Sequence, residues 1–199
     1  MFKDREAAVE KLSESIEDFE RPEKFDKVVA VTFSGLQTAE RISEELGISL
    51  ETVISLNLNV PGNSELAFGA VARDGTLWID DAMVEEFMID ENFIRERTSE
   101  VQQNIREDSD LDDAEACEEV KSQDILIVTD GVASGMRISA SIGSCLKKGA
   151  ESITVATPFI SETAHDRISG LADEIIYIKR PRFVVSVNDG YASQSRKSN

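Results

Sequence analysis

Residues 125–137 read ILIVTDGVASGMR, and this stretch decides the fold. Four apolar β-forming residues end in Thr129 and Asp130, and a loop of small residues then leads into a helix with apolar periodicity. A tight loop at a helix N-terminus presents unpaired amides that favour an anion. Asp130 lies at the carboxyl end of the strand, where open α/β sheets bind ligands. The stretch therefore predicts a sugar-phosphate site, and an ordinary strand–loop–helix turn is the alternative that it leaves open.

The composition indicates one globular domain in a reducing compartment. The chain has 199 residues, of which 41% are hydrophobic, which is enough for one core. It contains no apolar run of about 20 residues and no apolar signal segment at its charged start, so we expect a cytoplasmic protein. Cys117 and Cys145 lack metal-ligand spacing, and we expect Cys145 to be a reduced core residue.

The chain is strongly acidic. Its 39 acidic and 21 basic residues give a net charge of −18, which disfavours nucleic acids and anionic membranes as partners. An ordinary solvated acidic surface and adaptation to a salty cytoplasm are both open explanations.

Strand and helix patterns alternate along the chain, which predicts an α/β fold with a mostly parallel sheet covered on both faces. A hairpin over 68–79 turns at Asp74-Gly75, and Asp80 and Asp90 are expected to cap the two helices that follow. The acidic stretch 107–120 is expected to be a loop or frayed helix, and the residues from Asn188 a mobile tail. Strands are expected near 28–33, 52–58, 125–128, 152–156 and 174–178, with an edge strand over 183–187. Helices are expected over 4–19, from the residue after Gly35 to Leu46, over 136–147 and over 161–171.

With these elements in place, the chain resembles the type I phosphoribosyltransferases. The resemblance rests on the start Phe2-x-Asp4-Arg5, on PGNSELAFGAV at residues 61–71, and on residues 125–137. Shorter matches around Pro158, Phe183 and Tyr191 extend it over nearly the whole chain. The resemblance implies a single phosphoribosyltransferase-like domain over residues 1–199, with a central mostly parallel sheet flanked by helices and a projecting hairpin or hood.

Members of this family bind phosphoribosyl pyrophosphate with Mg²⁺ and transfer its ribose 5-phosphate to a base or another nucleophile. The resemblance implies that Asp130, the second acid of the family's acid pair, is the catalytic residue that orients the ribose, and that Thr129 stands on the ribose or metal side in place of the first acid. We expect Mg²⁺ to arrive bound to the substrate, with no residue of this chain as its direct ligand. The implied 5-phosphate loop consists of Gly131, Val132, Ala133, Ser134, Gly135 and Met136.

The chain departs from the family at the pyrophosphate loop. Phe33, Ser34 and Gly35 stand where the resembled branch has Arg-Gly-Gly, and Leu56-Asn57 stands where it has Arg-Lys. Because a charge-assisted contact contributes roughly 1.5–3 kcal/mol, we expect weakened pyrophosphate binding. Arginines elsewhere are candidates to compensate, namely Arg73, Arg95, Arg97, Arg106 and Arg137.

Two functions remain open. One is an active phosphoribosyltransferase, and the other is a regulatory protein that binds a nucleotide or sugar phosphate and has lost transfer chemistry. The expected partner is a small phosphoribosyl ligand, and the resemblance allows a homodimer. The single histidine, His165, is expected to be an ordinary residue of a surface helix. The sequence does not identify an acceptor base.

Overall fold

The structure is a computed structural model that describes residues 1–19, 25–107 and 120–192. Its core is a five-stranded sheet in the order β2-β1-β6-β7-β8, in which all neighbouring strands are parallel. The expected α/β architecture with a central parallel sheet is therefore confirmed. The strands are β1 (Lys27–Ala30), β2 (Ser49–Thr52), β6 (Asp124–Val128), β7 (Ser152–Phe159) and β8 (Glu174–Lys179).

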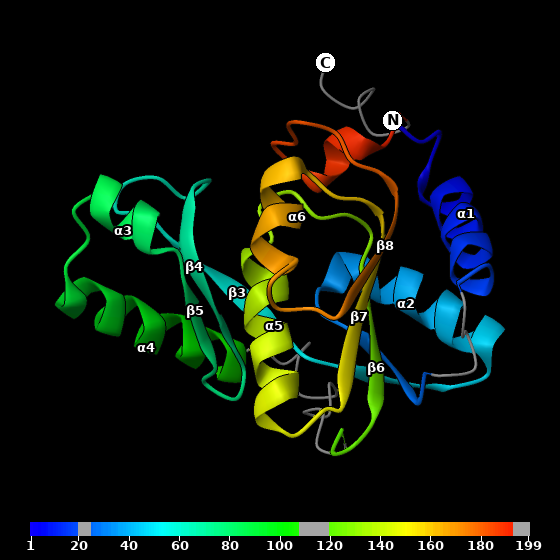
Figure 1. Cartoon of the computed structure of the whole chain (residues 1–199). Helices are drawn as coiled ribbons and strands as arrows, with labels where there is room; N and C mark the ends of the chain where they lie inside the picture. The colour runs from blue at the N-terminus through cyan, green and yellow to red at the C-terminus, as the bar shows by residue number, and fades with distance from the viewer. Residues whose placement is uncertain (20–24, 108–119, 193–199) are drawn as a thin grey trace.

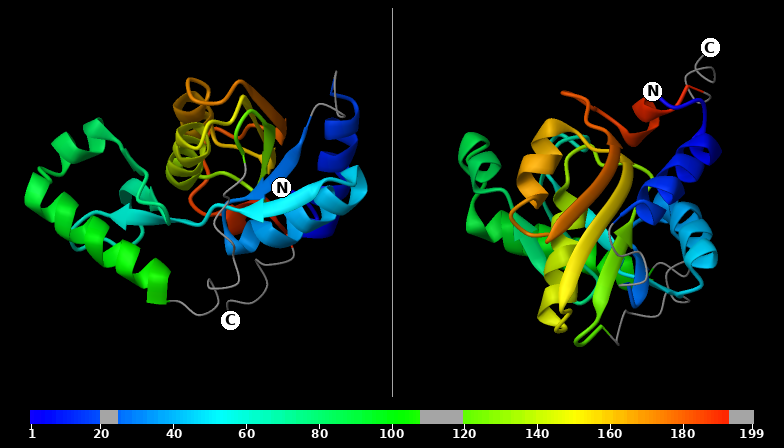
Figure 2. Two further views of the ribbon diagram at one scale, coloured as in Figure 1. Left: turned by 90° about the horizontal axis from the view of Figure 1, so that it is seen from below. Right: turned by 45° about the vertical axis from the view of Figure 1, so that its right-hand side comes forward.

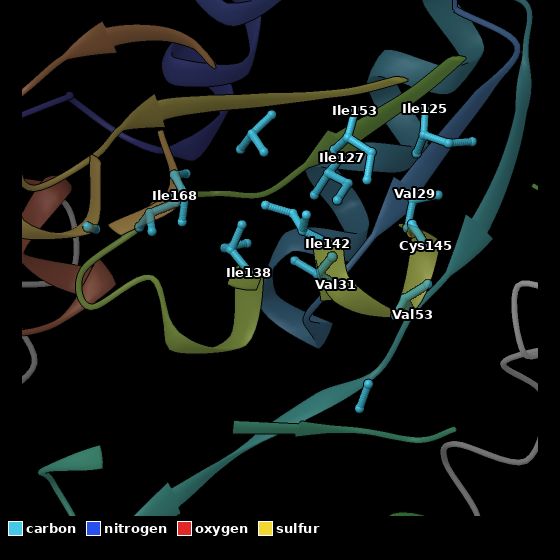
Figure 3. Packing of buried hydrophobic residues seen from close by; sticks show 14 of the residues in the cluster. Val29, Val31, Val53, Ile125, Ile127, Ile138, Ile142, Cys145, Ile153 and Ile168 are labelled. Atoms are coloured by element: carbon cyan, nitrogen blue, oxygen red, sulfur yellow. The ribbon is translucent and has the colours of Figure 1, made fainter. Parts of the chain in front are cut away.

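Helices cover both faces of this sheet (Figure 1). Val28 and Ala30 of β1 pack under α1 (Arg5–Glu17) and α2 (Phe33–Leu46). Val29 and Val31 face the other side, under α5 (Met136–Lys147) and α6 (Glu162–Ile168). Figure 3 shows this second cluster, in which Ile138 and Ile142 of α5 meet the isoleucines of β6 and β7. The alternation follows from the two-residue period of a strand that is buried on both faces.

Residues 55–107 form a smaller unit beside the core, which we call the hood (Figures 1 and 2). Its antiparallel sheet has the order β3-β4-β5, and the predicted hairpin is its β4–β5 pair. Asp80 and Asp90 accept hydrogen bonds from the first-turn amides of Met83 and Phe93, so the predicted caps are confirmed. The hood comprises β3 (Ser55–Asn59), β4 (Ala67–Ala72), β5 (Leu77–Ile79), α3 (Asp81–Glu86) and α4 (Glu91–Glu107).

Three expectations about the elements are wrong. The run 52–58 is not one strand, because the chain leaves the core sheet at Thr52 and enters the hood sheet at Ser55. The expected edge strand over 183–187 is absent from the described sheets, and β8 is the edge of the core sheet. The residues after Asn188 do not form a tail at once, because Tyr191 is buried and bridges to Phe2.

The predicted acidic loop lies outside the described residues from 108 to 119, as do Cys117 and the chain beyond residue 192. Cys145 is buried in the core, as expected. None of the helices in the described part of the chain has the length and apolar character that a bilayer crossing requires.

Candidate functional site

A cavity of about 680 Å³ opens at the carboxyl ends of the core strands, which is a usual size for a small-molecule site. Its walls come from the loops after β1 and β6, the start of α6, the hood and residues 182–188. Its charged lining residues are four arginines and one glutamate: Arg5, Arg137, Arg167, Arg182 and Glu65. In a chain with a net charge of −18, this cavity is therefore locally basic and suited to an anion.

The predicted 5-phosphate loop lies along this cavity, and all six of its residues line it. The Val132 amide donates to the carbonyl of Phe159 at 2.9 Å, and the Ser161 hydroxyl donates to the carbonyl of Ala133 at 2.6 Å. These bonds hold the loop against the end of β7. Among the described residues, the amides of Ala133, Ser134 and Gly135 have no acceptor, whereas the Val132 amide is already paired. The unpaired donors are therefore a narrower set than the sequence suggested.

Gly135 allows the loop to enter α5 and pack closely against α6. It is the N-cap of α5, with a φ of 78°, and no side chain caps the helix. A Cβ at Gly135 would lie 3.3 Å from the Cβ of Ala164. A larger residue at Gly135 would thus press on α6.

Asp130 lies at the end of β6, but it is buried and is absent from the cavity lining. Its exposed fraction is 1%. Its Oδ2 accepts a hydrogen bond from Arg5 Nε at 3.1 Å, and its Oδ1 accepts one from Ser34 Oγ at 3.2 Å. The Tyr191 hydroxyl donates to its backbone carbonyl. Its two partners, Arg5 and Ser34, do line the cavity, so the Asp130 carboxylate reaches it through them, and Thr129 lines the cavity directly.

Arg5 is one of the residues of this site to which the sequence analysis assigns no role. Asp4 caps α1 by accepting from the Ala7 amide, which places Arg5 in the first turn. The Arg5 guanidinium also lies 4.7 Å from the centroid of the Tyr191 ring and donates to Asn188 Oδ1 at 3.1 Å. The arginine of the Phe-x-Asp-Arg start therefore holds the buried Asp130 carboxylate.

The loop after β1 carries hydroxyl groups to the cavity. Thr32 Oγ1 caps α2 by accepting from the Gly35 amide at 3.0 Å, and Thr32 and Ser34 line the cavity. A Cβ at Gly35 would lie 3.2 Å from the Cα of Thr129, so glycine lets this loop approach the end of β6. The side chain of Phe33 lies outside what the structure describes.

Leu56 and Asn57 point to opposite faces of β3, as neighbours on a strand do. Leu56 packs against the apolar core of the hood, whereas Asn57 lines the cavity. The Asn57 Oδ1 atom is buried and has no hydrogen-bond partner among the described residues. Of the two positions, therefore, Asn57 lines the cavity and Leu56 belongs to the hood core.

Arg137 is the only one of the five proposed compensating arginines that lines the cavity. Arg95 and Arg97 pair with acids of their own helix, α4. Burial lowers the pKa of Arg137, and the nearby Asp130 carboxylate acts in the opposite direction. Arg167, which the sequence did not single out, donates to the carbonyl of Ser134.

His165 and Tyr191 lie outside the cavity lining. The imidazole of His165 packs edge-on against Tyr177, with 5.5 Å between the ring centroids. Tyr191 is a buried anchor against Phe2 and Phe159. The described residues include no group of three or more His, Cys, Asp or Glu side chains placed to hold a metal ion.

The chain is similar to known proteins at long distance. No protein-family model matches it. Two Mycobacterium tuberculosis proteins, whose names assign them provisionally to the phosphoribosyl transferases, are 25% identical to it over 175 residues, or 86% of this chain. The chain spans 39% of the length of these curated relatives.

Among solved structures, TT1426 from Thermus thermophilus superimposes with a TM-score of 0.73 and 25% identity, over 96% of this chain and 90% of that one. The purine phosphoribosyltransferase from Pyrococcus horikoshii superimposes with a TM-score of 0.52 over 88% of this chain and 84% of that one. Its 18% identity means that this likeness concerns the fold. Together, these comparisons show that the chain has the fold of a phosphoribosyltransferase and a distant sequence likeness to proteins named as phosphoribosyl transferases.

Proposed function

We propose that the cavity binds phosphoribosyl pyrophosphate or another 5-phosphorylated ribosyl ligand, and that the protein transfers its phosphoribosyl group to a base or other nucleophile. The observation that carries this proposal is the loop at the start of α5, whose unpaired amides of residues 133–135 face a cavity lined by four arginines. Amides at a helix N-terminus and a basic wall both favour a phosphate group.

Different residues of the cavity would bind different parts of the ligand. The loop amides and the exposed Ser134 hydroxyl would hold the 5-phosphate. The Thr129 hydroxyl would bind a ribose hydroxyl, and Asp130 would act by orienting Ser34 and Arg5 at the same edge of the cavity. Holding the ribose in this way would favour transfer by fixing its anomeric carbon for attack.

Mg²⁺ would enter with the ligand, coordinated by diphosphate oxygens, and would neutralise the departing pyrophosphate. The hydroxyls of Thr32 and Ser34 could hydrogen-bond to this end of the ligand, but neither supplies a charge. We therefore expect any transfer to be weak and ribose 5-phosphate or AMP to bind more tightly than pyrophosphate.

A regulatory protein without transfer activity is the second candidate. The environment of Asp130 favours this candidate. Both oxygens of its carboxylate already accept hydrogen bonds and its exposed fraction is 1%, so the carboxylate does not contact a ligand in the cavity directly. Single-turnover measurement of pyrophosphate release with a panel of bases and Mg²⁺ separates the two candidates. Binding of the ligand without release would favour the regulatory protein.

Isothermal titration calorimetry with ribose 5-phosphate and AMP tests the binding site itself. Ser134→Glu would place a negative charge in the loop and should weaken both ligands at least about tenfold. Ser99→Glu on the exposed surface of α4 makes the same chemical change away from the cavity and should leave both affinities unchanged. Equal affinities in the wild type and in Ser134→Glu would refute the site.

A further inference from the structure

Arg137 differs from the other three arginines of the cavity in its partners. Arg5 and Arg167 each donate to a carboxylate, and the Arg182 guanidinium lies 5.3 Å from the centroid of the Phe183 ring. The Arg137 guanidinium has no hydrogen-bond or ion-pair acceptor among the described residues, although its side chain is half-buried. A partly desolvated guanidinium that faces a cavity without an acceptor is suited to an anionic ligand group.

The backbone of Arg137 lies beside β3 of the hood. The Ser55 hydroxyl donates to the carbonyl of Arg137 at 3.0 Å. Asn57 lies two residues further along β3 and therefore on the same face as Ser55. Helical side chains lean toward the helix N-terminus, so Arg137 extends toward the end of β6. There the negative charge of Asp130 favours the charged form of its guanidinium.

Asn57 provides a second, independent sign of a ligand on this side. Its buried Oδ1 has no donor among the described residues, and a buried unsatisfied acceptor is costly unless a ligand pairs with it. A diphosphate that carries hydrated Mg²⁺ offers both an anion for a guanidinium and water O–H donors for an amide oxygen.

We propose that Arg137 binds the diphosphate group of the ligand and sets the preference for ligands that carry it. This inference rests on the proposed function. The cation that binds the diphosphate would thus come from the first turn of α5, next to the 5-phosphate loop, in place of the missing cations of the β1 loop and β3. Arg137 is a specificity-determining residue in this scheme, because it distinguishes phosphoribosyl pyrophosphate from ribose 5-phosphate.

The test is calorimetric titration of the wild type, Arg137→Met and Arg137→Lys with ribose 5-phosphate and with phosphoribosyl pyrophosphate plus Mg²⁺. Arg137→Met should weaken phosphoribosyl pyrophosphate by about 10- to 100-fold and ribose 5-phosphate by less than about threefold. Arg137→Lys should restore part of the loss, since it keeps the charge without the planar fork. Arg106→Met, which removes an exposed arginine of α4, is the matched control and should change neither affinity.

Equal weakening of both ligands, or no weakening of either, would overturn the role of Arg137 while leaving the proposed function in place. If the wild type binds neither ribosyl ligand, the proposed function fails, and inorganic pyrophosphate with Mg²⁺ becomes the deciding probe. Pyrophosphate binding that is lost in Arg137→Met would then support the anion site, and binding that is absent or unaffected would overturn it. Thermal melts of each variant verify that it is folded.

Discussion

The ion pair between Arg5 and Asp130 joins the first turn of α1 to the end of β6, and the loss of unfolding free energy on its removal can be worked out from the structure. Arg5→Met would leave the Asp130 carboxylate, with an exposed fraction of 1%, bonded to Ser34 alone. Breaking one side of a buried pair costs about 3–5 kcal/mol. Because 28% of the Arg5 side chain is exposed, we expect the low end, about 3 kcal/mol of unfolding free energy.

The partner substitution should cost less. Asp130→Asn keeps an acceptor for Ser34 and leaves a partly exposed guanidinium unpaired, so we expect a loss of about 1–2 kcal/mol. In the double variant no buried charge remains, and the total loss should be about 2 kcal/mol and not the sum of the two single losses. A cost of about 3 kcal/mol corresponds to a lowering of the melting temperature by roughly 6–12 °C.

Urea unfolding followed by far-ultraviolet circular dichroism measures this double-mutant cycle. The control is Arg41→Met, which removes an arginine from an exposed pair with Glu45 on α2 and should leave the urea midpoint unchanged. Single-variant losses that add to within about 0.5 kcal/mol in the double variant would refute the coupling. In that case the contact between Arg5 and Asp130 would not stabilise the folded state.

Four further outcomes are expected. Gly131→Ala should destabilise the protein by about 2–4 kcal/mol in urea, because the backbone has a φ of 151° and the new Cβ would lie 2.3 Å from Phe159 Cζ; a loss below about 1 kcal/mol would contradict the packing. Burial, and to a lesser extent the charge of Asp130, raises the pKa of Tyr191, so the folded state keeps the phenolic proton to a higher pH than the unfolded state does. The contribution of this proton to the free energy of unfolding should be complete below about pH 10 and lost above it in melts of the wild type. Melts of Tyr191→Phe should not show this loss. Arg167→Met removes an ion pair between α6 and Asp80 of the hood together with a hydrogen bond to the 5-phosphate loop. It should weaken AMP binding about tenfold and lower the melting temperature, and an unchanged AMP affinity would show that the loop does not need this hydrogen bond. The melting temperature should rise with KCl into the molar range because a charge of −18 opposes compaction, and a flat response would remove the salt-adaptation hypothesis.

The sequence predicted the core well because its strands are apolar runs bounded by polar or small residues. It failed between residues 52 and 58, where the apolar positions continue while the chain crosses from one sheet to another. Val53 and Ile54 are buried in this crossing, and no glycine or proline marks it. Residues 183–187 are rich in valine, which favours a strand, but there they line the cavity.

The candidate site was predictable where it is local in sequence and not where it depends on distant contacts. The 5-phosphate loop is contiguous, so its pattern sufficed to place it at the cavity. Arg5 and Asp130 are 125 positions apart, and no spacing rule joins them. The opposite orientations of Leu56 and Asn57 could have been anticipated from the period of a strand, since only alternate residues of β3 can face the cavity.

The hood is built from one uninterrupted run of sequence that lies between two strands of the core sheet. The 5-phosphate loop belongs to the core, outside that run. A single exchange of residues 55–107 by recombination would therefore replace one wall of the cavity and leave the loop intact. Such a graft must keep small residues where Ala67 and Ala70 meet Met136 and Ala140 of α5. The fold thus separates the inheritance of the two walls, so that the hood can diversify while the loop at the start of α5 is retained.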